Sequence, residues 1–332
     1  MRFIRVLLLA IVIVGLSSWG FLVHRTSTQL AVYQLPETMQ HFFYDGMDYL
    51  VRYSVRPDQR RNGDPSEGPK HFIDIERFGA NAATAMPLDW NSAVARYGED
   101  SLKRNGIVPY WVINQKEKLT EAFRSGNRDS ILFYATDLAH YIGDANVPLH
   151  TTENHDGQLT GQKGMHSLWE SAIPEIELAS YSLYEAHEAT YLKNPEEAIW
   201  KAVREANALL PQMFAMEKEV SKDFTDSTKY RYQMRNGRES RSYSSAFARA
   251  YAQKLAPGIN QQLLKSGHLI ADFWYTAWVD AGKPNLDGLL KAPATAQGRS
   301  AWAQELISYK TNQLLQNKML RAREKQESGG GD

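Results

Sequence analysis

The chain has 332 residues, which is enough to bury a sizeable core, and no low-complexity segment divides it, so we expect one compact domain. Lys plus Arg and Asp plus Glu both total 38, so no overall basic field favours nucleic acid or an anionic membrane as a partner, although this balance is compatible with a local patch. Cys is absent, which excludes disulfides, Cys-based zinc fingers, thiol nucleophiles and a lipoprotein anchor, and leaves His, Asp and Glu as the strong metal ligands.

The N-terminal segment has the pattern of an export signal. Two arginines precede an apolar run over residues 6–15 that is short for a membrane span, and small residues follow up to Ser18. We expect a signal peptide over residues 1–18, with cleavage before Trp19 and a periplasmic or extracellular mature protein. An uncleaved signal anchor is the alternative.

A surface loop is expected over residues 54–68, because prolines, glycines and charges alternate there and oppose a long helix. Loops on a rigid scaffold often carry function. Asp58 within this segment and His71 just after it are therefore candidate functional residues.

The rest of the chain predicts an all-α fold, because apolar residues recur at spacings of three and four and alternating Val, Ile and Thr runs are scarce. The clearest apolar stripe runs from Ile259 to Trp278 and is closed by Gly282 and Pro284. The other expected helices cover residues 110–123, 130–144, 195–216, 244–255 and 301–323. We expect the domain to span residues 19–323 and the polar tail, residues 324–332, to be disordered.

The densest cluster of candidate metal ligands lies at the end of the second of these helices. His140 and Asp144 are four residues apart, which places both side chains on one face of a helix where a single metal can contact both. Pro148 then ends the helix, so His150 can fold back toward the same region.

A second pair repeats this spacing. His166 and Glu170 follow a glycine-rich loop over residues 157–164 and would place another nitrogen and another carboxylate on one helical face. The alternative for each pair alone is a solvated helix face with incidental ion pairs. Four other histidines show no such partner spacing and are expected to have ordinary core or surface roles: His41, His155, His187 and His268.

Several common catalytic motifs are absent from the sequence. There is no His-Glu-x-x-His, no Gly-x-Ser-x-Gly, no phosphate-binding glycine-rich loop and no Glu-x-x-His pair. Metal-assisted hydrolysis remains, in which zinc lowers the pKa of a bound water and neutralises charge on a phosphate.

These motifs resemble the superfamily that joins bacterial zinc-dependent phospholipases C with secreted single-strand-specific nucleases. The resemblance covers residues 19–174, about half of the chain. It is carried by Trp19-Gly-x-x-x-His24, Asp58, His71-Phe-Ile-Asp, His140-Tyr-Ile-Gly-Asp144, Pro148-Leu-His150 and His166-Ser-Leu-Trp-Glu170.

The resemblance implies a multi-helix domain with a site for three zinc ions, each held by a set of residues in this chain. The first zinc would be held by Asp58, His71 and His140, with Asp144 bridging to a second. That second zinc would be bound by His24 and by the backbone amine and carbonyl of Trp19, and the third by His150, His166 and Glu170. A free amine at Trp19 requires cleavage of the signal peptide.

The resemblance further implies hydrolysis of a phosphodiester by zinc-bound hydroxide. Asp58 is the candidate for orienting or deprotonating the water, and its alternative is a plain ligand. Phe72 and Trp169 adjoin ligands and are candidates for stacking on a base or lining a pocket, with core packing as the alternative.

The motifs combine features of both branches of the superfamily, which differ in the phosphoester they cleave. The short segment between His150 and His166 and the Glu at position 170 resemble the phospholipase C branch, whereas the short Trp19 to His24 spacing resembles the nuclease branch. Because more of these marks resemble the phospholipase C branch, we expect a phospholipase C-like enzyme. A single-strand-specific nuclease is the alternative, and a non-catalytic zinc-binding helical protein is a second alternative. The substrate would be a phospholipid or single-stranded nucleic acid, with at most transient membrane contact and no protein partner.

Overall fold

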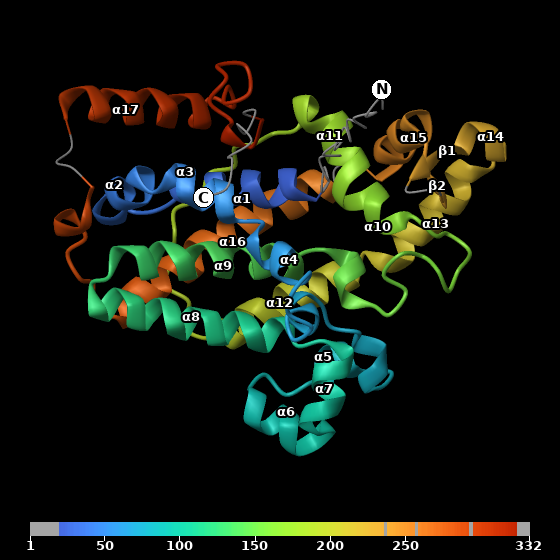
Figure 1. The fold of residues 1–332 in the computed structure, drawn as a ribbon, viewed down its shortest axis with the longest axis horizontal. Helices are drawn as coiled ribbons and strands as arrows, with labels where there is room; N and C mark the ends of the chain where they lie inside the picture. Colours follow the sequence, from blue (N-terminus) through green and yellow to red (C-terminus); the bar gives the residue numbers. More distant parts are fainter. Residues whose placement is uncertain (1–19, 236–237, 256–257, 292–294, 324–332) are drawn as a thin grey trace, which may run out of the picture.

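The computed structural model describes residues 20–235, 238–255, 258–291 and 295–323 (Figure 1). The predicted signal peptide, the predicted ligand Trp19 and the predicted disordered tail lie outside the described residues.

The described chain is helical apart from one short hairpin of strands. Its first part contains α1 (Phe21–Tyr33), α2 (Glu37–Asp45), α3 (Met47–Tyr53), α4 (Arg56–Arg60) and the 3-10 turns η1 (Gly68–His71) and η2 (Ile75–Phe78). The middle contains α5 (Ala82–Ala85), α6 (Trp90–Tyr97), α7 (Glu99–Asn105), α8 (Val108–Ser125), α9 (Arg128–Ala145), η3 (Pro148–Thr151), α10 (Met165–Ser167), the π-helical turn η4 (Leu168–Ala172), α11 (Ile173–Glu177) and η5 (Leu178–Ser180). The last part contains α12 (Pro195–Asn207), α13 (Leu210–Ser221), α14 (Asp226–Lys229), β1 (Tyr230–Arg235), β2 (Arg238–Tyr243), α15 (Ser245–Leu255), α16 (Gly258–Asp280), η6 (Asp287–Leu289), α17 (Ala296–Lys310) and η7 (Arg321–Arg323).

The centre of the fold is formed by α1, α8, α9 and α16, which pack against one another (Figure 1). A two-residue connection turns α8 back into α9. Gly126 adopts a left-handed conformation at the end of α8, with φ of 63°, and Asn127 caps α9 by accepting a hydrogen bond from the Ser130 amide at 2.9 Å. This tight turn makes α8 and α9 antiparallel neighbours, so the metal-ligand face of α9 is held against a rigid partner.

The core has two parts. The larger one surrounds the central helices and includes Phe43 and Trp274, whose rings stack with centroids 4.8 Å apart. The smaller one joins η3, α10 and η4 to α13 and α15 and includes Trp169, which is 3% exposed. The burial of Trp169 agrees with core packing, the alternative considered for this residue.

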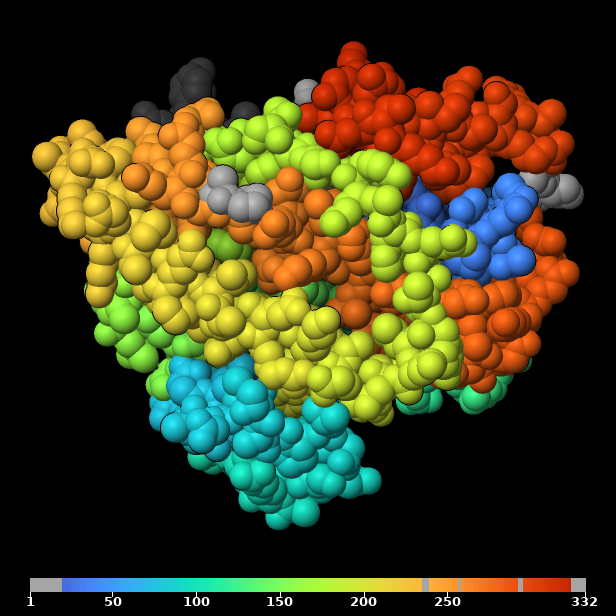
Figure 2. All heavy atoms as spheres, turned by 180° about the vertical axis from the view of Figure 1, so that it is seen from behind, coloured from blue at the N-terminus to red at the C-terminus, as the bar shows by residue number. Residues whose placement is uncertain are grey.

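Two peripheral segments cover the helical body. Helices α5, α6 and α7 project from one side of it (Figures 1 and 2). Residues 181–194 contain no helix or strand and cross the face shown in Figure 2, where the Thr190 amide donates to Asp272 on α16 at 2.7 Å and the Ala189 amide donates to the Gln34 carbonyl at 2.8 Å.

Most of the expected helices are present, and three expectations are wrong in detail. The segment 195–216 is split into α12 and α13 instead of forming one helix. The helix expected over residues 301–323 ends at Lys310, and Asn312 and Lys318 beyond it have positive φ, which an α-helix cannot contain. The segment 54–68 is not wholly a loop, because Pro57 lies in the first turn of α4, where a missing N–H costs nothing.

The sequence patterns also did not indicate the β1–β2 hairpin. It is antiparallel, with Tyr230 paired to Tyr243 and Arg235 to Arg238. Within the described residues, no helix is both long enough and apolar enough to cross a bilayer.

Candidate metal centre

The candidate ligands come from separate elements that meet at the end of α9. His24 lies on α1, Asp58 on α4, His71 at the end of η1, and His150 on η3. Backbone hydrogen bonds hold two of these segments together, since the Ile73 amide donates to the His150 carbonyl at 2.9 Å. Every predicted ligand within the described residues therefore reaches the same region of the fold.

Asp144 is the centre of this arrangement and is 1% exposed. Its Oδ2 atom lies 2.8 Å from His71 Nδ1 and 3.2 Å from His140 Nε2. Its Oδ1 atom lies 3.3 Å from His150 Nδ1 and 3.5 Å from His24 Nε2. The two carboxylate oxygens thus face different histidines, as expected of a carboxylate that bridges two metal ions.

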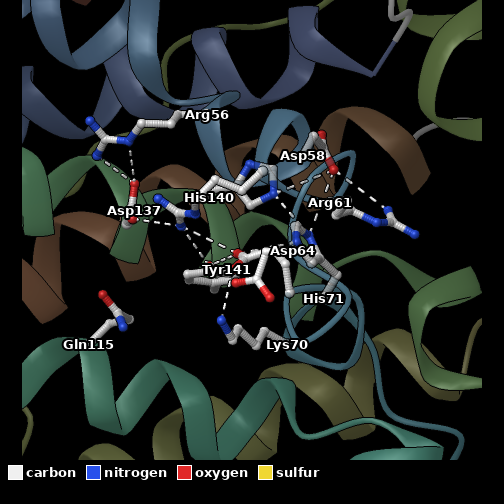
Figure 3. A network of polar contacts seen from close by, with 12 residues as sticks. Arg56, Asp58, Arg61, Asp64, Lys70, His71, Gln115, Asp137, His140 and Tyr141 are labelled. Atoms are coloured by element: carbon white, nitrogen blue, oxygen red, sulfur yellow. Dashed lines mark hydrogen bonds and ion pairs between the residues drawn. The ribbon is translucent and has the colours of Figure 1, made fainter.

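The first group consists of Asp58, His71, His140 and Asp144 (Figure 3 shows the first three), and His24 also lies close enough to Asp58 and His140 to share a metal with them. Asp58 Oδ1 lies 3.7 Å from His71 Nδ1 and 3.8 Å from His140 Nε2, and these two nitrogens are 3.1 Å apart. Two ligands at about 2.1 Å from a tetrahedral zinc ion are about 3.4 Å apart. The ligand separations in this group are close to that value, so the donor set fits zinc.

His140 is oriented by a hydrogen bond on the far side of its ring. Its Nδ1 lies 2.8 Å from the carbonyl oxygen of Ser54, the residue that ends α3. A carbonyl only accepts, so Nδ1 carries a proton, and Nε2, which faces Asp144, is the atom through which His140 would bind a metal in exchange for its own proton. This is the tautomer that a metal requires at Nε2.

The second group contains His24, which is stacked on His140 with ring centroids 4.1 Å apart. A Cβ atom on Gly143 would lie 2.8 Å from His24 Nδ1, so only glycine at this position of α9 leaves room for the imidazole. Trp19 itself is outside the described residues, but a Cβ atom on Gly20 would lie 3.4 Å from Glu170 Oε2. The start of the described chain is therefore close to the predicted ligands.

The third group consists of His150, His166 and Glu170. Glu170 Oε1 lies 3.0 Å from His150 Nε2, Glu170 Oε2 lies 2.9 Å from His166 Nε2, and the two histidine nitrogens are 3.3 Å apart. These separations also fit a tetrahedral ion.

The four-residue spacing of His166 and Glu170 predicted a regular α-helix, but the segment that carries this pair departs from α-helical geometry. Residues 168–172 form the π-helical turn η4. Pro174 explains the widening, because it has no N–H to donate to the Glu170 carbonyl and its ring would collide with that carbonyl in an α-helix.

Charge in the centre is strongly coupled. Burial alone would raise the pKa of Asp144, but His140 and His150 outweigh it and hold that pKa well below its ordinary value. Burial would lower the pKa of His140, but Asp144 and Asp58 raise it to about 9. Burial and the neighbouring His140 lower the pKa of His24 to about 4. Asp144 is therefore ionised, and its buried negative charge is balanced by the protons on neighbouring histidines, a role that a divalent cation would fill more completely.

Unpaired polar atoms give the same indication. Two buried atoms that face the centre make no hydrogen bond of good geometry, although each is near a charged partner: His150 Nδ1, 3.3 Å from Asp144 Oδ1, and Glu170 Oε1, 3.0 Å from His150 Nε2. Such atoms are costly unless something binds them. The donor set of imidazoles and carboxylates is one that zinc accepts.

The sequence patterns did not indicate an outer layer of charges behind His71 (Figure 3). Glu67 is 1% exposed, accepts hydrogen bonds from Tyr141 and, at 2.8 Å, from Lys70, and lies 3.6 Å from His71 Nε2. Burial would raise the pKa of Glu67, but contacts with His71, Lys70, Tyr141 and Arg60 hold it well below its ordinary value. The spacing of Glu67 to Lys70 and to His71, three and four residues, was the available signal.

A second buried carboxylate extends this layer. Asp137 accepts from Arg56 at 2.6 Å and lies 2.8 Å from Arg60, which also donates to Glu67 at 3.3 Å. The excluded histidines lie elsewhere or at the edge: His187 and His268 stack on each other, while the exposed His155 lies near His166, with ring centroids 6.2 Å apart.

Comparison with known proteins agrees with this geometry. A family profile described as S1/P1 Nuclease matches residues 19–276, which is most of the chain. No curated protein matches the chain significantly. The family match favours the nuclease alternative and does not support the phospholipase C-like interpretation or a phospholipid substrate. The chain belongs to the S1/P1 nuclease family and is a zinc-dependent hydrolase of phosphoester bonds.

Proposed function

We propose that this protein cleaves phosphodiester bonds in single-stranded nucleic acid with three zinc ions held by the three groups described above. The observation that carries the proposal is the position of Asp144, whose two oxygens face separate sets of histidines. When bound, zinc supplies an acidified water and positive charge for the phosphate. The proposed ligands are Trp19, His24, Asp58, His71, His140, Asp144, His150, His166 and Glu170.

Differences in exposure suggest how the work is divided among these residues. The Asp58 side chain is 29% exposed, whereas those of His71 and His140 are at most 2% exposed. Asp58 is thus the member of the first group that water can reach, and we assign it the role of orienting or deprotonating the attacking water. The His166 side chain is 33% exposed, so the third group is open to a phosphate oxygen.

An aromatic neighbour is also available for a base. Trp169 is buried in the core, but Phe72, which directly follows His71, is only partly buried. A partly exposed ring next to the first group is suited to stacking on a nucleobase.

The proposal includes export of the protein. A terminal amine at Trp19 can bind a metal only after residues 1–18 are removed, so the mature protein would start at Trp19 in the periplasm or outside the cell. Mass spectrometry of the exported protein would give this start directly, and any other start would remove Trp19 from the proposed ligands.

The function is tested with a substrate panel. Mature protein would be incubated with single-stranded DNA, RNA, double-stranded DNA, phosphatidylcholine vesicles and bis(p-nitrophenyl) phosphate, with and without a chelator. We expect cleavage of single-stranded DNA and RNA that the chelator abolishes and zinc restores. Cleavage of phosphatidylcholine without cleavage of nucleic acid would contradict the proposal and restore the phospholipase interpretation.

A further inference from the structure

Positive charge is concentrated in the β1–β2 hairpin, although the whole chain has a net charge of zero. Residues 229–243 contain Lys229, Arg231, Arg235, Arg238 and Arg241 but only one acidic residue, Glu239. Arg231 and Arg241 are exposed, and neither makes an ion pair among the described residues, whereas Lys229 pairs with Glu217 at 2.7 Å. The two arginines therefore offer charge to a partner from outside the chain.

The hairpin is anchored firmly on one face. Tyr230 and Tyr243 are paired across the strands and buried, with ring centroids 5.2 Å apart. The Tyr243 hydroxyl donates to Glu217 at 2.9 Å. Because side chains alternate along a strand, the opposite face carries Arg231 opposite Ser242, followed by Gln233 opposite Ser240. This polar face is consequently presented by a fixed support.

The polar face lines a cavity of about 250 Å³ that is also lined by Ser167 and Ser171. Arg241, which by register belongs to the tyrosine face of the hairpin, reaches the same cavity. Each of these serines follows a proposed ligand of the third group, His166 or Glu170, by one residue. Neighbouring residues on a helix are separated by roughly a quarter of a turn, and a helix is about 10 Å wide. The two serines and the two ligands therefore lie on adjacent sides of one helical segment, and the cavity flanks the third group. Glu175 also lines the cavity, but Arg323 lies 3.5 Å from its carboxylate and offsets its charge.

We propose that this hairpin and cavity bind the phosphodiester backbone of a single-stranded nucleic acid, one or more nucleotides away from the bond that is cleaved. The inference rests on the proposed function. Guanidinium groups bind phosphate with two parallel hydrogen bonds, and serine hydroxyls and the Gln233 amide add donors. The donor-rich cavity favours a nucleic-acid backbone over a lipid surface, which would be expected to meet a larger apolar patch.

The proposal predicts that the hairpin matters for long substrates and not for short ones. The test compares zinc-loaded wild type with an Arg231→Glu/Arg241→Glu double variant, measuring kcat/KM for a 12-nucleotide DNA and for a dinucleotide. We expect the ratio of the two kcat/KM values to fall at least about fivefold, mainly through KM for the longer substrate. Each lost phosphate contact should lower the salt slope of binding by about 0.7, so two contacts give about 1.4.

The matched control is Lys310→Glu, which reverses an exposed charge on α17, a helix that Figure 1 places apart from the hairpin. It should keep the wild-type ratio and salt slope. Both arginines are exposed, but Arg241 also lies over the ring of the buried Tyr230, with 4.1 Å to the ring centroid. The single variant Arg231→Glu is therefore measured beside the double variant; it should unfold at the same temperature as the control and still lower the length ratio.

Two results would overturn the proposal. One is an unchanged length ratio in the double variant. The other is loss of binding to phosphatidylserine-containing vesicles with unchanged oligonucleotide kinetics, which would make the hairpin a lipid-binding surface. Failure of the proposed nuclease function can be distinguished from failure of the hairpin proposal. In the first case the wild type would cleave neither the oligonucleotide nor the dinucleotide. Fluorescence anisotropy with the 12-nucleotide DNA would still report whether the hairpin binds it.

Discussion

Replacing Glu67 by Gln should weaken zinc binding at the first group without touching a ligand. His71 turns Nδ1 toward Asp144 and Nε2 toward Glu67, at 2.8 Å and 3.6 Å respectively. A histidine bound to metal through Nδ1 carries its proton on Nε2, and Glu67 is the buried carboxylate that the described structure places beside that proton. The substitution keeps the shape of the side chain and removes its charge.

The expected size of the effect follows from the 3.6 Å separation. Two full charges at that distance attract by about 4 to 5 kcal/mol at an effective dielectric constant of about 20. A metal-bound imidazole carries only part of a charge, so a loss of about 2 kcal/mol is reasonable. This corresponds to the roughly 10- to 100-fold loss of metal affinity that outer-layer substitutions cause.

The assay is a competition titration with a chromogenic zinc chelator, starting from metal-free protein. One zinc equivalent should bind about 10- to 100-fold more weakly in Glu67→Gln than in wild type. The matched control is Glu305→Gln, because Glu305 is also buried and accepts from Tyr33 at 2.5 Å, Tyr44 at 3.0 Å and Arg321, but belongs to α17.

The control separates a positioning role from a purely structural one. Both variants should lower the free energy of unfolding of the metal-free protein, because both leave buried cationic partners without a full counter-charge. Only Glu67→Gln should change zinc affinity. Wild-type zinc affinity in Glu67→Gln, together with the expected loss of stability, would refute the positioning of His71 by Glu67.

Three further changes test other parts of the structure. Asp144→Asn should lose most of the bound zinc and at least about a hundredfold in kcat on single-stranded DNA, and full zinc content by elemental analysis would contradict the bridging role. Gly143→Ala would place a Cβ atom 2.8 Å from His24 Nδ1 and should displace that imidazole. The zinc content should then fall, while the free energy of unfolding of the metal-free protein changes by no more than about 1 kcal/mol. Burial and two neighbouring carboxylates raise the pKa of Asp74 to about 6. The folded state thus favours the protonated acid, and its stabilising contribution is lost as pH rises through 6. Asp74→Asn should therefore raise Tm relative to wild type more at pH 7.5 than at pH 5, and the gain in the free energy of unfolding should not exceed about 3 kcal/mol. An equal shift of Tm at both pH values would exclude this linkage.

The sequence predicts those parts of the fold that depend on local periodicity and end signals. Helix α16 agrees with the stripe from Ile259 to Trp278, and α9 contains the expected pair of His140 and Asp144 on one face. The break between α12 and α13 coincides with Pro211 in the first turn of α13, a local signal that the prediction of a single helix overlooked. Helix α17 ends at Lys310, just before Asn312, whose positive φ is not helical.

The hairpin shows another limit of sequence patterns. Strand β1 alternates Tyr and Met with Arg and Gln, but β2 reads Arg-Glu-Ser-Arg-Ser-Tyr, so the alternation that indicates a strand is missing from its partner. Its position beside the third group follows from tertiary packing alone.

The candidate site divides in the same way. Ligand candidates such as His71 and His150 could be chosen because histidines and carboxylates recur in a characteristic order, and the structure brings them within about one ligand spacing of each other. Glu67 has no comparable signature, since a lone Glu in a charged, proline-rich segment looks like a solvated residue until its burial against Tyr141 and Lys70 is seen.

The most direct test of the account is a zinc titration of metal-free mature protein with cleavage of single-stranded DNA as the readout. We predict no cleavage before zinc is added and a plateau as zinc approaches three equivalents per chain. Full cleavage without zinc, or no cleavage once three equivalents are bound, would contradict the account.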